Sequence, residues 1–468
     1  MKYVMLWTDL LIYILCLCVF AFAWYARKKE YLLGPWRQVI TRHTGAMATV
    51  VLLTYVAIGL LDSVHFRLAL EEKDNSGEVV YSSEVLSVLD WLSNPIRLAQ
   101  EKTYSAPFSV HLYTKDTIEM PDGSKVRDYQ RLAYGGAHLV EPEERTLDII
   151  KLTIIAAIKG MSAWLLFFAG VVYFLAERWK VSTKRVIKII FKSEGELPWR
   201  TIFLTIAIVF FLVAFTTQLA GKYHVFGTDK VGQDVFYQTL KSIRTGLVIG
   251  TLTTLVMLPF AVMLGIMAGY FRGWVDDVIQ YLYTTLSSIP GVLLITAAIL
   301  ILQVYMSNNP DAFGSLTERA DIRLLFLCII LGITSWTGLC RLLRGEALKL
   351  REMDYVQAAT AFGVNHFVII VRHILPNVMH IVLISVVLDF SGLVLAEAVL
   401  SYVGVGVDPS MISWGNMINS ARLEMAREPI VWWPLLSAFL FMFVLVLFAN
   451  LFSDAVRDAF DPRLRKRG

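Results

Sequence analysis

DYVQAATAFGVNHFVIIVRHILP, residues 354–376, is only half apolar and lies between two strongly apolar segments. Asp354 can cap a helix here, with Gln357 three residues later as a weak capping box. Apolar side chains follow at the spacing of one helix face, at Tyr355, Ala358, Ala359 and Phe362. Gly363 suits the left-handed residue that ends such a helix. The pattern predicts a short helix that begins near Asp354 and stops at Gly363.

A second helix is predicted directly after this glycine, and we call residues 354–376 the elbow. Asn365 can begin the second helix, and helical spacing returns at Phe367, Ile370, Val371 and Ile374 before Pro376 closes the unit. The two alanines at the centre of the first helix would let another surface approach its backbone closely. The elbow therefore fits a docking helix, and it fits equally an amphipathic helix lying on the membrane surface.

The composition of the chain is that of an integral membrane protein. Of its 468 residues, 56% are hydrophobic and only 18% are charged, with a mean hydropathy of +0.59. Because about 20 helical residues cross the hydrocarbon core, the long apolar runs predict nine spans. They lie near residues 4–24, 45–61, 152–176, 201–220, 245–270, 276–305, 323–343, 378–403 and 432–453. Pro290-Gly291 predicts a kink in the sixth span.

Lysine and arginine gather near the ends of the predicted spans. The clusters lie within residues 27–42, 178–200, 341–372 and 463–467. All four fall on one side when nine spans are drawn, and the positive-inside rule makes that side the cytoplasm. The N-terminus is then outside, and the elbow and the C-terminus are cytoplasmic. The first apolar run precedes its strongest positive cluster, which favours an uncleaved anchor over a signal peptide.

No motif for catalysis or for a cofactor occurs in the sequence. G-x-x-x-x-G-K-[ST], H-E-x-x-H and G-x-S-x-G are all missing, so neither a P-loop nor an enzyme is expected. Four cysteines, Cys16, Cys18, Cys328 and Cys340, lie in or near apolar spans and are interpreted as small buried hydrophobic residues, with no metal and no disulfide. The net charge of +4 reflects topology and gives no support to nucleic-acid binding.

Residues 62–151 form the only sizeable region outside the predicted spans. Apolar residues at 85–92 predict a short helix, residues 110–113 predict a strand, and Pro121-Asp122-Gly123 predicts a turn. The predicted topology makes this region a small extracytoplasmic α+β insert of about 90 residues. One hypothesis for it is a sensor or a scaffold.

The elbow resembles the EAA loop of ABC importer permeases, whose pattern is EAA, three residues, glycine, nine residues and Ile-x-Leu-Pro. Gln357-Ala358-Ala359, Gly363 and Leu375-Pro376 match in register, while Gln357 replaces glutamate and His373 replaces isoleucine. Residues 199–463 are similar throughout to the C-type permease subunit of dipeptide and oligopeptide importers. The other matching pieces, in family order, are Gly227-Thr228-Asp229, Gly232-x-Asp234-Val235-Phe236, Gly269-Tyr270-Phe271-x-Gly273-Trp274-Val275-Asp276, Leu395-Ala396-Glu397-Ala398 with Leu400-Ser401-Tyr402, Ser413-Trp414-Gly415 and Arg457-Asp458-x-x-Asp461-Pro462-Arg463.

This resemblance implies a type I ABC importer transmembrane fold with six core helices in the bacterial inner membrane. It implies a second permease subunit in a heterodimer, two cytoplasmic ABC ATPase subunits and an extracytoplasmic solute-binding protein as partners, besides membrane lipid. The first elbow helix would be the coupling helix, seated on an ATPase. Its coupling residues would be Tyr355, Gln357, Ala358, Ala359, Phe362 and Gly363. An ion-gradient-driven transporter is the alternative.

The same resemblance divides the chain. Residues 1–180 would be an N-terminal extension with three extra spans and the insert, and residues 199–242 the first core span with its external loop. Residues 243–454 would be the permease domain, with its coupling loop at 346–376, and residues 455–468 a cytoplasmic tail.

Two acidic residues lie inside the predicted span 378–403. Asp389 and Glu397 are eight residues apart, on one broad side of a helix. Ionisable groups at membrane depth usually face a cavity or a partner. Both residues are candidates for a pore lining that meets the amine of a peptide, or for a hydrogen bond at a subunit interface. Glu397 matches the family pattern and is interpreted as structural, whereas both interpretations of Asp389 stay open.

Overall fold

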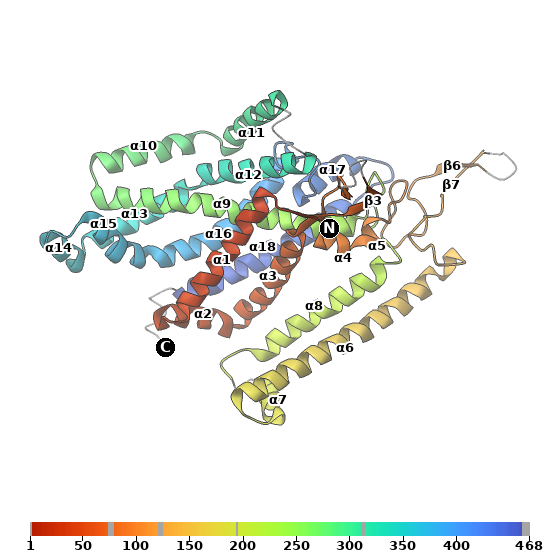
Figure 1. Cartoon of the computed structure of the whole chain (residues 1–468), viewed down its shortest axis with the longest axis horizontal. Helices are drawn as coiled ribbons and strands as arrows, with labels where there is room; N and C mark the ends of the chain where they lie inside the picture. The colour runs from red at the N-terminus through yellow and green to blue at the C-terminus, as the bar shows by residue number, and fades with distance from the viewer. Residues whose placement is uncertain (1, 74–78, 120–124, 193–194, 310–314, 461–468) are drawn as a thin grey trace. The chain divides into compact units, whose positions relative to one another are not determined.

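The computed structural model describes residues 2–73, 79–119, 125–192, 195–309 and 315–460, and it is predominantly helical (Figure 1). Nine helices within these ranges are long and apolar enough to cross a membrane. Each overlaps one predicted span, so the all-α membrane fold is confirmed. The sixth, Gly291–Asn308, covers only the second half of the predicted span 276–305. The predicted turn at 121–123 and the basic residues 463–467 lie outside the described residues.

The chain forms two compact units. The first comprises residues up to Val4, Arg37–Thr245 and Ile412–Phe448. The second comprises Met5–Trp36, Gly246–Met411 and the chain from Ala449 onward. Both units include parts of α2 (Glu30–Thr41), α9 (Val235–Phe271) and α18 (Trp433–Phe460).

The first unit contains α3 (His43–Asp62), α6 (Arg145–Trp179) and α8 (Trp199–Ala220), all of them candidate spans. The long helices α6 and α8 lie side by side in Figure 1. A short helix, α7 (Thr183–Lys192), packs on their ends, and α17 (Trp414–Glu424) precedes α18.

The insert belongs to the first unit and mixes short strands with short helices, as predicted. β2 (His65–Arg67) pairs with both β1 (Lys2–Val4) and β5 (Leu86–Ser87) in an antiparallel sheet. Two separate hairpins pair β3 (Ala69–Lys73) with β4 (Val79–Tyr81) and β6 (Asp116–Glu119) with β7 (Lys125–Asp128). The helix predicted at 85–92 is α4 (Val88–Leu92), followed by α5 (Asn94–Arg97).

The strand predicted at 110–113 is wrong. Only isolated bridges form there, between Ser105 and Leu112 and between His111 and Arg131. Val110 and Leu112 are buried, so their alternation reflects packing rather than a ladder of strand hydrogen bonds.

The second unit contains α1 (Trp7–Ala26), α10 (Trp274–Ser288), α11 (Gly291–Asn308), α12 (Leu316–Ser335), α13 (Thr337–Arg351) and α16 (Leu375–Tyr402). The kink predicted at Pro290-Gly291 is a complete break, because helix α10 stops at Ser288 and α11 begins at Gly291. A proline cannot donate the hydrogen bond that a continuous helix would need there.

One of the extra N-terminal helices packs directly on a predicted core span. The Thr8 backbone N–H of α1 donates to Asp321 Oδ2 of α12 over 3.1 Å, and the Thr8 hydroxyl also donates to this carboxylate. Thr8 and Asp321 are both buried. Helix α1 is therefore part of the packed membrane unit and not a loosely attached anchor.

The cysteines are only partly where the sequence predicts them. Cys328 and Cys340 are buried, as expected, whereas Cys16 and Cys18 are exposed on α1. All four are free thiols. Within the described residues no group of three His, Cys, Asp or Glu side chains could hold a metal ion.

Candidate functional site

The first elbow helix is α14 (Asp354–Ala361). Its N-cap residue is Met353 and not Asp354, which lies inside the first turn, and no side chain caps the helix. The predicted capping box is therefore wrong: the Gln357 Nε2 instead faces the Glu352 backbone oxygen at 3.3 Å. Asp354 can still stabilise the helix through its charge, which favours a position near the helix N-terminus.

Gly363 ends α14 in the way predicted. Its backbone is left-handed, with a φ of +72°, and this conformation favours glycine. Steric crowding is not the reason, because a Cβ at this position would meet nothing within 4 Å. The Gly363 N–H donates to the Thr360 oxygen, and the Val364 N–H donates to the Ala359 oxygen. This is the Schellman pattern, which fixes the direction in which the chain leaves the helix.

α14 has one face held in the protein and one face open. Val356 is buried in a large apolar cluster, and Ala359 packs half-buried against the same cluster. Tyr355, Gln357, Ala358 and Phe362 are exposed, with 87% of Phe362 accessible. Six predicted coupling residues are thus brought together at α14, but Ala359 faces inward rather than toward a partner.

The second elbow helix runs without a stop into the membrane span. α15 (His366–Ile369) is capped by Asn365, whose side chain accepts the Phe367 N–H over 2.9 Å, as predicted. A single π-helical turn, η3 (Ile370–Ile374), then leads into α16. Pro376 does not close the unit, because the wider turn before it accommodates the missing N–H and the bulk of the ring.

Side-chain contacts connect the elbow to the helices of the second unit. The Tyr270 hydroxyl of α9 lies 2.7 Å from His366 Nδ1, and Arg272 pairs with Glu352 at 2.6 Å. The Asn377 amide lies 3.3 Å from the Tyr355 hydroxyl. These contacts fix both ends of the elbow to the ends of membrane helices.

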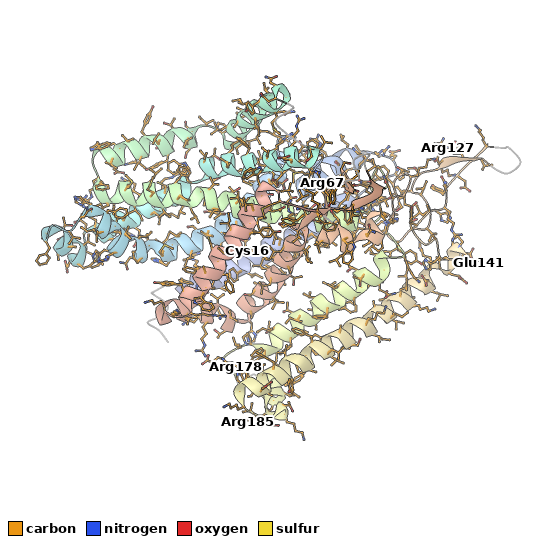
Figure 2. All side chains as sticks on the ribbon, viewed as in Figure 1. Cys16, Arg67, Arg127, Glu141, Arg178 and Arg185 are labelled. Atoms are coloured by element: carbon orange, nitrogen blue, oxygen red, sulfur yellow. The ribbon has the colours of Figure 1, made fainter. Side chains whose placement is uncertain are left out.

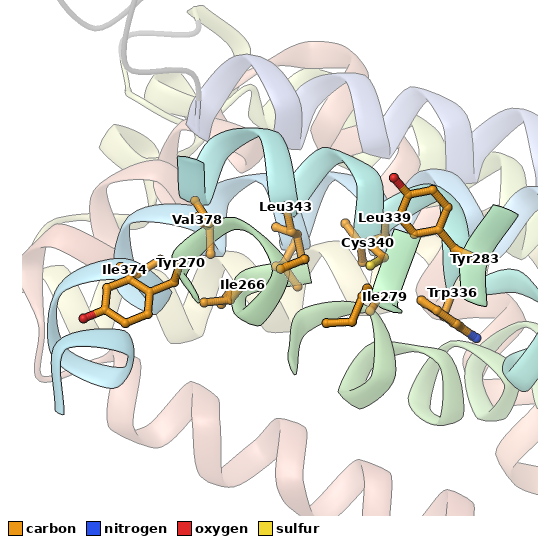
Figure 3. Close-up of a cluster of buried hydrophobic side chains, with 14 of the residues drawn as sticks. Ile266, Tyr270, Ile279, Tyr283, Trp336, Leu339, Cys340, Leu343, Ile374 and Val378 are labelled. Carbon is orange, nitrogen blue, oxygen red and sulfur yellow. The ribbon is translucent and has the colours of Figure 1, made fainter. Parts of the chain in front are cut away.

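The apolar cluster under the elbow joins helices α9, α10, α13 and α16 and the π-helical turn η3 (Figure 3). Its labelled side chains come from α9, α10, α13, η3 and α16, and include Ile266, Tyr270, Ile279, Leu343, Ile374 and Val378. Arg344 of α13 donates two 2.6 Å hydrogen bonds to the carboxylate of Asp276 on α10. Apolar packing and this bidentate ion pair together make α13 a firm support for α14.

Two glycines let α9 approach α13 closely. A Cβ on Gly265 would lie 2.8 Å from the Cys340 oxygen. A Cβ on Gly269 would lie 2.6 Å from both the Ala347 Cβ and the Arg344 oxygen. Gly265 and Gly269 are four residues apart, the spacing that brings helix backbones together in membranes.

We expect Gly269→Ala to lower stability, with Gly345→Ala as its matched control. Both changes add one methyl group to a helix and gain the same helix propensity, but at Gly345 the Cβ would meet nothing within 4 Å. Overpacking costs about 1–3 kcal/mol, so Gly269→Ala should unfold at a clearly lower temperature than Gly345→Ala in the same detergent. Equal melting temperatures would contradict the close helix approach.

The two acidic residues of the membrane span differ in their surroundings. Glu397 is buried, with 2% of its surface exposed, and accepts a 2.7 Å hydrogen bond from the Ser401 hydroxyl. Asp389 is half-buried and has no hydrogen-bond or ion-pair partner within the described part of the chain. One turn further on, a Cβ on Gly392 would meet nothing within 4 Å.

A buried polar network in the first unit is missed by sequence reasoning. His224 Nδ1 lies 2.7 Å from Asp234 Oδ2, and His224 Nε2 lies 3.4 Å from Glu101 Oε1 of the insert. The Glu101 carboxylate also accepts the backbone N–H groups of residues 133–135 over 2.8–3.0 Å. The insert is thereby fastened to the loop between α8 and α9.

The hydrogen bonds of this network reverse the effect of burial on the pKa values. Burial alone would lower the pKa of His224, but its hydrogen bonds to Asp234 and Glu101, with their charges, raise it to about 9. Burial alone would raise the pKa of Glu101, but the hydrogen bonds from His224 and the three backbone N–H groups lower it to about 2. The histidine is therefore an imidazolium ion at neutral pH.

Two glycines of the loop between α8 and α9 allow this close contact. A Cβ on Gly232 would lie 1.8 Å from the Glu101 oxygen, and one on Gly227 would lie 2.3 Å from the Ser105 oxygen. The Trp433 indole N–H donates to the Thr228 oxygen over 2.9 Å. The loop between α8 and α9, whose sequence alone looks like that of an ordinary turn, is thus packed between the insert and α18.

A second ionic contact links the insert to α9. The Lys241 ammonium group lies 2.5 and 2.6 Å from the two oxygens of Asp90, and the Tyr237 hydroxyl donates to the same carboxylate over 2.6 Å. Asp62, at the end of α3, lies 3.8 Å from Lys241. The insert and one of the extra spans therefore meet the beginning of a predicted core helix.

The C-terminal part of the chain is similar in sequence to known membrane transport proteins. Residues 261–466 match the family model described as binding-protein-dependent transport system inner membrane component. The chain is 32% identical over 243 residues to the glutathione transport system permease protein of Pectobacterium atrosepticum, covering 52% of this chain and 73% of that protein. The dipeptide transport system permease protein of Bacillus subtilis is 30% identical over 243 residues, covering 52% and 70%. The oligopeptide transport system permease protein of Haemophilus influenzae is 32% identical over 243 residues, covering 52% and 71%.

Proposed function

Since this chain belongs to the family of binding-protein-dependent transport system inner membrane components, it is a permease subunit of an ABC importer, and we propose that its substrates are short peptides. The three relatives above are named for glutathione, dipeptides and oligopeptides, which are all short peptides. The protein is a multi-pass inner membrane protein. The family membership removes the support for an ion-gradient-driven transporter.

We further propose the partners that such a permease needs. A second permease subunit would complete the translocation path as a heterodimer, and an external solute-binding protein would deliver the peptide. Two cytoplasmic ATPase subunits would supply the energy, because the chain has no P-loop of its own. The N-terminus would lie outside and the elbow and C-terminus in the cytoplasm, as the distribution of lysine and arginine predicts.

The observation that carries the coupling role is the division of α14 into a held face and an open face. Val356 fixes the helix in the apolar cluster, while Phe362 projects with 87% of its surface exposed. Fully burying one such phenylalanine gains about 1.5–3 kcal/mol, so an ATPase groove that covers Phe362 and Tyr355 would hold the helix. The neighbouring Ala358 leaves its backbone open to close approach.

A push on α14 would reach the membrane helices through its fixed contacts. The contact of Tyr270 with His366 ties the elbow to α9, and the Tyr355–Asn377 contact ties it to α16. Arg272, directly after α9, also pairs with Glu352, just before the elbow. Packed helices that move as rigid bodies can convert such a push into alternating access. The elbow needs no catalytic group for this task.

We also propose the division of the chain that the sequence predicts. Residues 1–180 are the extension with its insert, residues 199–242 the first core span and its loop, and residues 243–454 the permease domain with its coupling loop at 346–376. The tail, 455–468, is described only as far as Phe460, where α18 ends.

Transport by proteoliposomes that contain the complete system tests the proposed function. Uptake of a labelled dipeptide should require ATP, the binding protein and both ATPase subunits, and an imposed ion gradient should not replace ATP. Uptake that persists without the ATPase subunits would contradict the proposal.

Asp389 is proposed to line the translocation path, where its carboxylate would meet cationic groups of a passing peptide. The support is its half-buried position without a partner among the described residues, beside the open space at Gly392. Glu397, which already bonds to Ser401, is proposed to be structural.

We expect Asp389→Asn to reduce uptake of lysine-containing dipeptides several-fold more than uptake of neutral dipeptides. The amide keeps the shape of the side chain but removes its negative charge. That charge would attract the lysine side-chain ammonium group, which a neutral dipeptide lacks, an effect of about 1 kcal/mol or more at partly buried sites. Glu397→Gln serves as the control and should affect both substrates alike. Equal uptake of the two dipeptides by Asp389→Asn would contradict a pore position.

A further inference from the structure

Helix α7 (Thr183–Lys192) has two sharply different faces. Val186 and Ile190 are buried against α6 and α8, in a cluster with Val172, Ala176 and Phe203. The opposite face is basic and exposed. It carries Lys184, Arg185, Lys188 and Lys192.

The charges on this basic face are not neutralised by ion pairs among the described residues. Within the described part of the chain none of the four makes an ion pair, although exposed pairs such as Lys349–Glu346 form elsewhere. Figure 2 labels Arg178 and Arg185 at the end of the α6–α8 pair where α7 lies. Within the described residues the basic face is therefore a surface of concentrated positive charge.

The aromatic residues beside α7 are of the kind that gathers at the depth of the lipid headgroups. Trp179 at the end of α6 and Trp199 at the start of α8 pack edge to face, with ring centroids 6.2 Å apart. Tryptophan gathers at membrane–water interfaces, and only residues 180–182 separate Trp179 from α7. Ile187 and Phe191, at the border of the basic face, are 38% and 54% exposed, so apolar surface is available to the acyl region.

We propose that the basic face of α7 binds anionic phospholipid headgroups and anchors the α6–α8 pair to an anionic membrane surface. A helix with lysines and arginines on one side and exposed apolar residues at the border is suited to the headgroup boundary. Clustered cations at this depth attract anionic lipids. The residues lie outside the match to the transport family, which begins at residue 261, and the proposal does not depend on the transported substrate.

Lipid binding by the purified full-length chain tests this directly. Native mass spectrometry of the protein in mild detergent would compare binding of dioleoyl-phosphatidylglycerol with binding of dioleoyl-phosphatidylcholine. The test variant is Lys184→Gln/Arg185→Gln/Lys188→Gln. The matched control is Arg27→Gln/Lys28→Gln/Lys29→Gln, which also removes three exposed cations from the side predicted to be cytoplasmic.

The wild-type chain and the control should prefer phosphatidylglycerol by roughly fivefold or more, and the α7 variant should lose that preference. Lys184→Arg/Lys188→Arg should keep it, because the charge is retained. Unchanged melting temperatures in phosphatidylcholine would show that every variant is folded. An α7 variant that still prefers phosphatidylglycerol, or a control that loses the preference equally, would overturn the proposal.

Discussion

Replacing Ala358 with aspartate is expected to abolish transport while leaving the permease folded in the membrane. Ala358 is exposed on the open face of α14, so the new carboxylate meets only water in the isolated chain. In the proposed complex the same carboxylate would be buried without a partner, at a cost of several kcal/mol. Because about 1.4 kcal/mol is a tenfold change in affinity, we expect at least a tenfold loss of ATPase co-purification and of peptide uptake.

The choice of position follows from the structure. Ala359 is half-buried against the apolar cluster, so a charge there would disturb the fold of the permease itself. Thr360→Asp is the matched control, because Thr360 is exposed on a different side of the same helix. The control should retain most of the co-purified ATPase. Normal ATPase binding and uptake by Ala358→Asp would remove the coupling-helix assignment.

The second large effect is expected in the pH dependence of stability, through His224. Its pKa is raised from 6.5 to about 9 in the folded chain, and only 3% of its surface is exposed. A raised pKa contributes stability that is fully present below about pH 6.5 and is lost as the pH rises through 9. The shift corresponds to about 3 kcal/mol.

The comparison of wild type with His224→Gln isolates this contribution from other groups that titrate at alkaline pH. Glutamine can keep a hydrogen bond but has no charge, so the stability advantage of the wild type should be largest near pH 6 and small near pH 10. Glu101→Gln removes one of the two carboxylates and should move the alkaline midpoint to lower pH. A wild-type advantage that is constant from pH 6 to pH 10 would contradict the imidazolium assignment.

The number of spans was predictable because each depends only on a local run of apolar residues. The elbow was predictable for a similar reason, since Gly363 and Asn365 act on their own neighbouring backbone groups. The predictions from the sequence that were wrong concern contacts between residues far apart in the chain. The π-helical turn before Pro376 and the inward position of Ala359 both depend on how the elbow packs against α9 and α13.

Contacts between distant residues also explain why the structure of the insert was harder to predict from the sequence. Gly227 and Gly232 look like ordinary turn residues, yet the backbone of Ser105 and Glu101 requires them to be glycine. Nothing near His224 in the sequence indicates that Glu101, more than 100 residues earlier, is its partner. The contacts of Glu101 make the insert part of the first unit rather than a separate module.

Photo-crosslinking from the tip of the elbow tests the central claim most directly. Benzoyl-phenylalanine at position 362 replaces the highly exposed phenylalanine that follows α14 directly, and the same residue at position 191 on α7 serves as the control. Illumination of membranes that contain the whole system should join position 362, but not position 191, to an ATPase subunit. A transport-competent variant that forms no ATPase adduct from position 362 would contradict the coupling role of the elbow.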